Sequence, residues 1–182
     1  MKKFLLLILL FGSFYCRGQQ VPQMDEKDTA AMVKASYLYN FAKLIDWPDD
    51  ETEANDYKTG NFIISIMGSS NLHKELVKKY NSKQIGSQQI EIRKLSRTLN
   101  ISKCHLLYVG EEAIDMLPEI AAALSDKPTM IITDHDGALE KGSALNFEFV
   151  NGQWRYILKL ENATNKNLFI GSTLKSLALK VE

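Results

Sequence analysis

Three histidines are the side chains of this chain best suited to metal binding or proton transfer: His73, His105 and His135. No two of them stand at a metal-ligand spacing such as His-x-x-x-His. His105 follows Cys104, but neighbouring residues of a strand point to opposite faces, so these two cannot form a nucleophile–base pair. The sequence therefore predicts no catalytic residue, no metal site and no cofactor.

Residues 134–137 (Asp-His-Asp-Gly) have the composition of a calcium or magnesium loop. The EF-hand pattern requires a glutamate at its twelfth position, and residues 139–141 do not fit that frame. A turn explains the segment better, with Asp134 bonded to its own backbone and the glycine at a positive φ. A metal-dependent hydrolase built on Asp134, His135 and Asp136 is the least favoured alternative.

Residues 68–71 (Gly-Ser-Ser-Asn) join an expected strand to an expected helix. The N-terminus of a helix attracts anions, so this turn could hold a carboxylate or phosphate of a small ligand. No lysine follows as a phosphate-binding loop requires, and a simple capped turn is the alternative.

Periodic segments indicate the elements that would position these residues. Apolar or alternating runs rich in β-branched residues predict strands over residues 61–68, 88–95, 104–109, 129–133, 144–150 and 153–160. Helical spacing predicts helices over residues 33–47 and 72–80, from Glu111 onward, and over 170–181. Pro118 would either kink the third helix or start another.

The order of these elements predicts the fold class. Strands alternate with helices, so we expect a single α/β domain with a mixed sheet flanked by helices. Asn151-Gly152 between two strand-like runs is a strong hairpin signal. The chain should thus end in a β-hairpin and a closing amphipathic helix, whose stripe is Ile170, Leu174, Leu177, Ala178 and Val181.

Residues 1–18 have the form of a secretory signal peptide. Two lysines precede an apolar run over residues 4–11, which is too short to cross a bilayer, and cleavage is expected after Gly18. Lipidation at Cys16 is an alternative, which the bulky residues before the cysteine disfavour. We expect a flexible leader over residues 19–28 and the domain over 29–182.

Charge excludes one class of partner. The chain has 22 basic and 22 acidic residues, and loss of Lys2, Lys3 and Arg17 with the signal leaves 19 basic ones, a net charge of about −3. The sequence has no basic stripe of the kind that binds nucleic acid, so we expect no nucleic-acid partner. It also has no second apolar segment long enough to span a bilayer, so we expect that the mature chain does not insert into a membrane.

Cleavage after Gly18 also leaves Cys104 as the one cysteine of the exported protein, with no internal disulfide available. Cys104 is expected as a small buried hydrophobic residue. A redox-active thiol or an intermolecular disulfide is the alternative.

Residues 33–48 carry the most informative pattern. Read as a helix ended by Pro48, they place apolar side chains on one side and polar ones on the other. The buried side would hold Val33, Tyr37, Leu38, Phe41, Leu44 and Ile45, and the polar side Ser36, Asn40, Lys43 and Asp46.

The order of residues in this helix resembles the opening helix of the YfiR/HmsC-like family (domain of unknown function 4154). Segments 62–68, 104–110, 133–142 and 162–178 resemble later parts of the family in the same order, so the resemblance covers about residues 30–181. It implies a small exported protein of the kind best known as periplasmic repressors of membrane-bound diguanylate cyclases. Members of this family often carry disulfides, whereas this chain would have a single cysteine after cleavage and no internal disulfide.

Aromatic and basic side chains outside the expected core are the candidates for partner binding, because Trp, Tyr and Arg dominate interface hot spots. These are Tyr39, Lys43 and Trp47 on the first helix, and Trp154, Arg155 and Tyr156 on the second hairpin strand. Ordinary packing against the sheet or a second helix is the alternative for each.

We therefore expect an exported, periplasmic, non-enzymatic regulator that restrains an inner-membrane signalling protein, either a diguanylate cyclase or a sensor kinase. The family and the hairpin also suggest a homodimer. The first alternative is a periplasmic small-molecule receptor, with a pocket between the strand ends and the first helix lined by Tyr39 or Tyr108.

Overall fold

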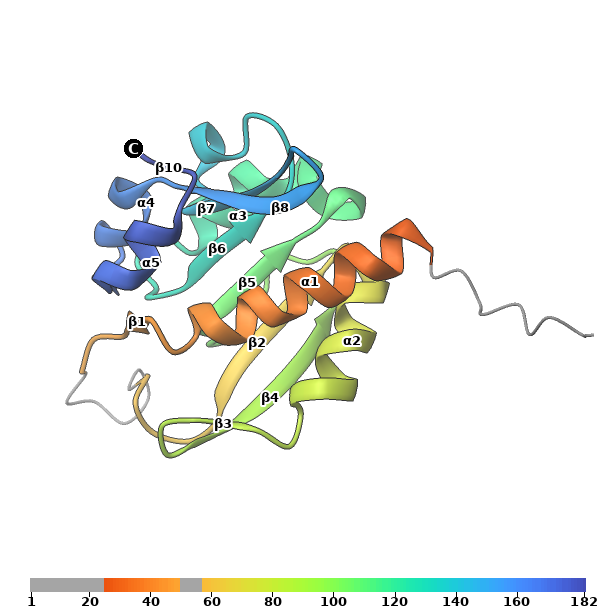
Figure 1. Cartoon of the computed structure of the whole chain (residues 1–182). Helices are drawn as coiled ribbons and strands as arrows, with labels where there is room; N and C mark the ends of the chain where they lie inside the picture. Colours follow the sequence, from red (N-terminus) through yellow and green to blue (C-terminus); the bar gives the residue numbers. More distant parts are fainter. Residues whose placement is uncertain (1–24, 50–56) are drawn as a thin grey trace, which may run out of the picture.

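The computed structural model describes residues 25–49 and 57–182; the expected signal peptide lies outside them. Its centre is an eight-stranded sheet in the order β10-β8-β7-β6-β5-β2-β4-β3 (Figure 1). The strands of this sheet are β2 (Phe62–Met67), β3 (Gln84–Ile85), β4 (Gln88–Leu95), β5 (Leu106–Val109), β6 (Met130–Thr133), β7 (Leu145–Val150), β8 (Gln153–Leu158) and β10 (Lys180–Val181). A separate antiparallel pair joins β1 (Ile45–Asp46) to β9 (Phe169–Ile170).

The sheet is mixed, as predicted. Strands β4, β2, β5, β6 and β7 run parallel, whereas β8 is antiparallel to β7 and β3 is antiparallel to β4. The first strand of this parallel set, β2, lies inside the sheet. The chain moves from β2 to β4 on one side and then to β5 on the other, so the strand order reverses between β2 and β5.

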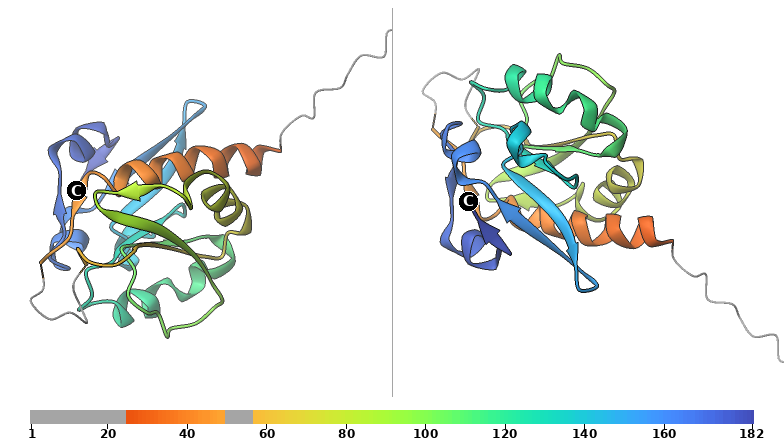
Figure 2. Two further views of the ribbon diagram at one scale, coloured as in Figure 1. Left: turned by 90° about the horizontal axis from the view of Figure 1, so that it is seen from below. Right: turned by 90° about the horizontal axis from the view of Figure 1, so that it is seen from above.

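Helices cover both faces of the sheet. α1 (Glu26–Phe41) and α2 (Ser70–Tyr80) lie on one face, whereas the 3-10 helix η1 (Glu111–Met116) and α3 (Leu117–Ala123) lie on the other (Figure 2). The remaining helices are η2 (Leu139–Lys141), α4 (Leu160–Thr164) and α5 (Ser172–Leu177). The expected single α/β domain is therefore confirmed.

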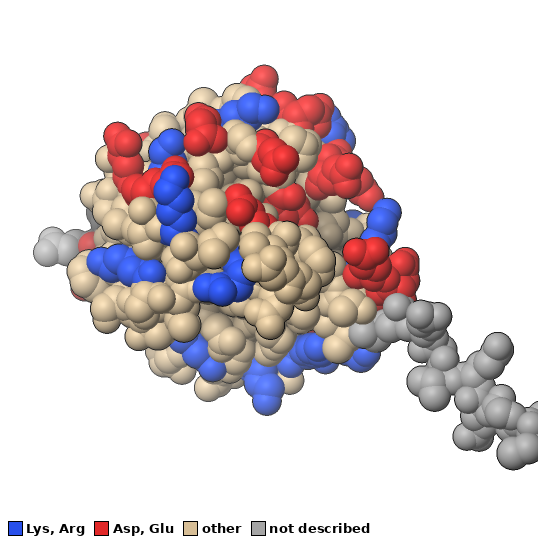
Figure 3. Space-filling view, turned by 45° about the horizontal axis from the view of Figure 1, so that its top comes forward, with Lys and Arg blue, Asp and Glu red and all other residues tan. Residues whose placement is uncertain are grey.

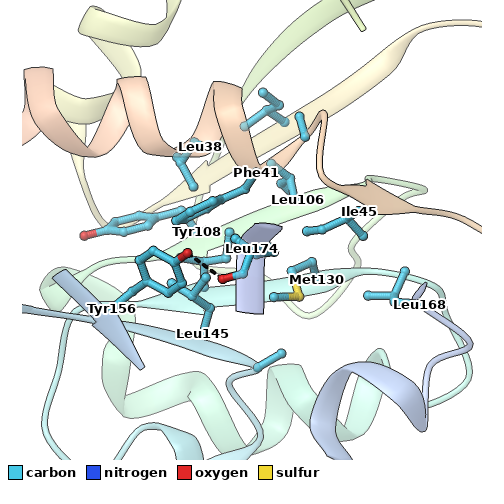
Figure 4. Packing of buried hydrophobic residues seen from close by; sticks show 14 of the residues in the cluster. Leu38, Phe41, Ile45, Leu106, Tyr108, Met130, Leu145, Tyr156, Leu168 and Leu174 are labelled. Atoms are coloured by element: carbon cyan, nitrogen blue, oxygen red, sulfur yellow. Dashed lines mark hydrogen bonds between the residues drawn. The ribbon is translucent and has the colours of Figure 1, made fainter. Parts of the chain in front are cut away.

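Each face has its own core, because successive side chains of a strand point to opposite sides. On β2, Ile64 and Ile66 pack toward α1, and Ile63 and Met67 pack toward α3. In the larger core, Phe41 of α1 packs edge-on against Tyr156, with the ring centres 4.9 Å apart (Figure 4).

The first helix is displaced from its prediction. It begins at Glu26, inside the expected leader, and ends at Phe41. Ile45 then pairs with Ile170 in β1–β9, so the last predicted turns of the helix are a turn and a strand. The backbone of β1 pairs with β9, and α1 ends before Pro48 is reached.

The buried face of α1 also differs from the predicted one. Ala31, Lys34, Ala35, Leu38 and Phe41 are buried, whereas Val33 and Tyr37 are only half-buried. Apolar residues occur all around this helix, so their spacing did not single out the face that meets the sheet. Two alanines at the contact allow the helix to approach the strands closely.

The hairpin is confirmed. β7 and β8 flank Asn151 and Gly152, whose φ angles of 51° and 78° are both positive, as a two-residue type I′ turn requires. The outer edge of β8 is only partly free, because β10 pairs with it at Ile157 and Leu158.

The closing helix is shorter than predicted. α5 spans six residues, because Ile170 lies in β9 and Val181 in β10. Leu174 is buried, but Leu177 is 57% exposed. Earlier in the chain, Pro118 lies in the first turn of α3, which fits the alternative of a second helix.

Candidate functional site

A cleft of about 370 Å³ opens at the carboxyl ends of the parallel strands. It lies beyond β2 and β5, where the strand order reverses, and α1 and α2 form its other walls. Open α/β sheets bind ligands at this position, because loops on either side diverge there. The cleft is therefore the best candidate for a small-molecule site in the described residues.

Two glycines form the floor of the cleft. Gly110 donates its backbone N–H to Met67 at 2.8 Å, which brings the ends of β5 and β2 together. A Cβ on Gly110 would lie 2.5 Å from the carbonyl oxygen of Gly68, and Gly68 itself has a φ of 72°. Neither position accepts a larger residue without moving the backbone.

An ion pair between a buried lysine and a partly buried aspartate closes one side of the cleft. Lys34 of α1, which is 6% exposed, pairs with Asp134 after β6, and its Nζ also lies 3.7 Å from the centre of the Trp154 ring. The sequence predicts that Asp134 bonds its own backbone, but its carboxylate pairs with Lys34 of α1 instead. Removing one partner of such a pair leaves the other charge without its counter-ion.

Tyr108 lies under the same pair. Its side chain is 2% exposed, and its hydroxyl interacts with the carboxylate of Asp134. Burial, and then the negative charge of Asp134, raise the pKa of Tyr108 well above its ordinary value. The hydroxyl therefore stays protonated and can serve as a hydrogen-bond donor.

The start of α2 forms another wall of the cleft. Ser69 makes no side-chain cap to this helix, and the first helical amide bond runs from His73 to Ser69 at 3.2 Å. Ser70 Oγ accepts from Lys94 at 2.9 Å, and Asn71 donates to Asp28 at 3.0 Å. Amides at such an end suit a negatively charged or carbonyl group of a ligand.

The segment 134–137 forms a turn, as favoured. His135 donates its backbone N–H to Asn146 Oδ1 at 2.9 Å, and Gly137 has a φ of 71°. His135 is exposed, while Asp134 faces Lys34, so the hydrolase residues do not converge. In the described part of the chain, no three His, Cys, Asp or Glu side chains are placed to hold a metal ion.

His105 is a structural residue of the core. Its Nδ1 accepts the Ile63 N–H at 2.9 Å, so Nε2 carries the proton and donates to the Tyr57 carbonyl at 2.7 Å. Burial lowers the pKa of His105 to about 4. The ring packs against Phe62 and Trp47.

Cys104 is fully buried on the opposite side of the sheet from His105. It is a free thiol, and burial raises its pKa. A reactive thiol needs exposure and a lowered pKa, so this environment favours the structural alternative.

The candidates on the first helix separate into two groups. Tyr39 is half-buried and stacks on Tyr80 of α2 with ring centres 4.5 Å apart; Lys43 is exposed and lies 3.8 Å from the Tyr39 ring. Trp47 is 5% exposed and donates Nε1–H to Pro128 at 2.9 Å, so its prediction as a surface residue is wrong. The chain has left the helix before Trp47, and helical spacing no longer describes where it points.

The hairpin candidates also separate. Tyr156 is 1% exposed and donates its hydroxyl to the Leu174 carbonyl at 2.7 Å (Figure 4), so it is a core residue rather than a surface one. Burial raises its pKa to about 12. Trp154 is half-buried on the same face, over Lys34, and Arg155 is half-buried on the other. Tyr39, Lys43, Trp154 and Arg155 thus keep some exposed surface.

Lys34 is a residue of the cleft that the sequence does not predict as a site residue. No local pattern links it to Asp134, because 100 residues separate the two. Tyr108 was expected to line a pocket between the strand ends and the first helix, and it does. Tyr39 does not line this cleft.

The strand order and the cleft define a doubly wound α/β protein with its candidate site at the reversal point of the sheet. The chain belongs to the YfiR/HmsC-like family (domain of unknown function 4154), which it matches over residues 31–179. No curated protein matches it. None of the helices in the described residues is long and apolar enough to cross a membrane.

Proposed function

We propose that this protein is an exported regulator that restrains an inner-membrane signalling enzyme, a diguanylate cyclase or a sensor kinase, by binding its periplasmic domain. The family membership over residues 31–179 is the observation that carries this proposal, because it includes nearly the whole folded domain. The signal-like residues 1–18 support export to the periplasm.

The mechanism is differential binding, without catalysis. A regulator shifts its partner only by the difference between its affinities for the partner's two conformations. A tenfold preference for the inactive conformation corresponds to about 1.4 kcal/mol, and switching from 1:99 to 99:1 needs a preference of about 10⁴. Release follows when a signal weakens the preferred complex.

Surface residues of the α1–α2 side offer a contact for this partner. Tyr39 is ordered by its stack on Tyr80, and Lys43 lies over its ring, so the pair presents an aromatic surface with a positive charge. An ordered aromatic side chain loses little conformational entropy on binding, which suits a hot spot.

The test is a pull-down of the mature protein from solubilised membranes of its host, with mass spectrometry of the captured proteins. We expect a membrane protein that carries a periplasmic domain and a cyclase or kinase domain. Tyr39→Ala and Lys43→Glu should reduce its recovery, and Lys175→Glu, an exposed lysine on α5, serves as the matched charge control. Equal recovery without this protein on the resin would contradict the proposal.

A second function is favoured by the cleft: a receptor for a small polar molecule. Its floor, its ion pair and the Tyr108 hydroxyl are fixed by contacts within the protein, as the polar groups of binding pockets usually are. The two functions are compatible, because a ligand in the cleft could supply the signal that releases the partner.

Thermal shift with amino acids, organic acids, sugars and nucleotides tests the receptor. A ligand at 100 times its Kd stabilises the folded state by about 2.7 kcal/mol. The shift should shrink in Tyr108→Phe, which removes only the hydroxyl, and persist in His135→Gln, an exposed control. Ligand-induced shifts of the melting temperature that are equal in the two variants would mean that the ligand binds outside the cleft.

A further inference from the structure

Strand β4 has an outer edge that the sheet leaves unpaired over most of its length. The short strand β3 is its neighbour on that side, and it pairs with β4 only at Gln88 and Gln89. In the left view of Figure 2, β4 faces the viewer, with α1 and α2 on one side of it and α3 on the other. An unpaired edge presents backbone donors and acceptors to another extended chain.

One hydrogen bond shows which backbone groups point outward. Ile90 donates its N–H to the carbonyl of Lys83 at 2.9 Å, on the side away from β2. Because alternate residues of a parallel strand direct their backbone groups to the same side, those of Ile92 and Lys94 also point away from β2, whereas those of Arg93 point toward it. Within the described residues, no group bonds to the outward N–H and C=O of Ile92 and Lys94.

Lysines lie at both ends of this free stretch. Lys83 is exposed and marks the end next to β3. Lys94 is exposed at the other end, and its Nζ donates to the neutral Ser70 hydroxyl at 2.9 Å, so its charge is not cancelled by that contact. Figure 3 shows Lys and Arg side chains, with no acidic ones between them, along the lower margin of the molecule on the side of α2.

Other charged side chains on β4 and beside it are already paired. Glu91, the acidic residue of β4, accepts hydrogen bonds from Arg93 at 2.6 Å and from Asn61 at 3.0 Å. Further ion pairs join Arg97 to Asp115, and Lys78 and Lys79 to Glu75. The charge that remains beside the free edge is therefore positive, from Lys83 and Lys94.

The middle of the free stretch is apolar and adjoins the aromatic stack of α1 and α2. Ile92 is half-buried and packs against the larger core, between the two lysines. Lys83 donates its N–H to the Tyr80 carbonyl at 2.9 Å, and Tyr80 stacks on Tyr39. The edge of β4 therefore continues the surface that Tyr39 and Lys43 present.

We propose that the outer edge of β4 binds an extended, acidic segment of another protein, which adds a strand between Lys83 and Lys94. Acidic side chains near the ends of this segment face the two lysines, and a β-branched residue at its centre lies next to Ile92. A second copy of this chain is a poor occupant, because pairing of two such edges would bring their lysines together. The proposal rests on the proposed function only for the source of the segment, which is then the membrane signalling enzyme.

An NMR titration of the mature protein tests the edge without any membrane partner. The probe is a capped Glu-Thr-Val-Thr-Glu peptide, used up to about 10 mM because a single short strand binds weakly. We expect the amide signals of Ile92 and Lys94 to shift and their hydrogen exchange to slow, while the exchange of Arg93, whose N–H points toward β2, changes less. No change on β4, or equal changes with a capped Lys-Thr-Val-Thr-Lys peptide, would overturn the proposal.

Ile92→Pro tests the same edge against the captured membrane enzyme. Proline removes the outward N–H, which edge strands tolerate, and Ile92→Val keeps it as the matched control. We expect Ile92→Pro to be folded by circular dichroism and to recover roughly tenfold less enzyme, with no loss for Ile92→Val. Should Ile92→Pro not fold, Lys94→Glu is expected to show the same loss, with Lys175→Glu on α5 as its control.

The outcomes separate the edge from the proposed function. Full recovery of the enzyme by folded Ile92→Pro and by Lys94→Glu would overturn the β4 contact and leave the proposed function standing. If the wild type captures no membrane enzyme, the proposed function fails, and the peptide titration alone decides whether β4 accepts an acidic strand.

Discussion

The buried imidazole of His105 makes a specific prediction about acid stability. Its Nδ1 accepts the Ile63 N–H at 2.9 Å, and its protonated Nε2 donates to the Tyr57 carbonyl at 2.7 Å. A second proton on Nδ1 would face a donor and place a charge in the core. The folded state therefore resists protonation, and acid acts on the unfolded state first.

The magnitude follows from the two pKa values. The ordinary pKa is 6.5, and burial lowers it to about 4 in the folded protein. Above pH 6.5 both states are neutral at His105, and its contribution to stability is fully present. Between pH 6.5 and pH 4 the unfolded state binds more protons, so the free energy of unfolding falls as the pH falls, by about 3 kcal/mol in all.

Urea unfolding from pH 7 to pH 4 measures this loss. His105→Gln has no titrating ring, so its free energy of unfolding should start lower and fall by about 3 kcal/mol less than that of the wild type. His135→Gln removes an exposed histidine and should follow the wild type. Carboxylates and His73 titrate in all three proteins and cancel in the comparison.

A parallel pH dependence in wild type and His105→Gln would show that His105 does not contribute to the loss of stability in acid. Titration of the ring by NMR in the wild type gives an independent answer if the variant does not fold. A pKa near 6.5 would show that the imidazole is solvated. A pKa near 4 would also show that His105 cannot act as a switch near neutral pH.

The remaining predictions concern the core and the cleft. Phe41→Ala should lower the free energy of unfolding by about 3–5 kcal/mol in urea melts, because the ring is 2% exposed, and Phe41→Asp should leave the domain unfolded by circular dichroism. Lys34→Ala should lower the free energy of unfolding by about 3 kcal/mol in the same assay by leaving Asp134 unpaired, and Lys34→Met with Asp134→Asn should recover much of it; no recovery would mean that the ion pair itself stabilises the fold. Gly110→Ala should lower the melting temperature, because its Cβ would meet a carbonyl oxygen at 2.5 Å; an unchanged melt would show that the floor can move. Cys104 should react with a thiol reagent only at the rate of unfolding, and rapid labelling of the native protein would restore its redox alternative.

Much of the fold follows from local signals in the sequence. The apolar runs that became β2, β5 and β6 are continuous because both of their faces are buried, and Asn151-Gly152 fits the positive φ angles of the hairpin turn. The ends of α1 and α5 were less predictable. Pairing of Ile45 with Ile170 ends one helix and shortens the other, and it depends on residues far apart in the chain.

The site was predictable only in its position. Parallel strands predict a cleft at their carboxyl ends, and Tyr108 is the last residue but one of β5, at whose end the cleft opens. The partner of Lys34 was not predictable, because nothing in its neighbours shows that the sheet brings Asp134 beside it. Trp47 was misplaced because helical spacing was applied beyond the last residue of α1.

We propose that this protein restrains a membrane signalling enzyme. The most direct test is the activity of the captured cyclase or kinase in membrane vesicles, with the protein titrated onto the periplasmic side. We expect inhibition that saturates with the protein and is weakened by Lys43→Glu but not by Lys175→Glu. An enzyme whose activity stays constant while the protein is bound would contradict it.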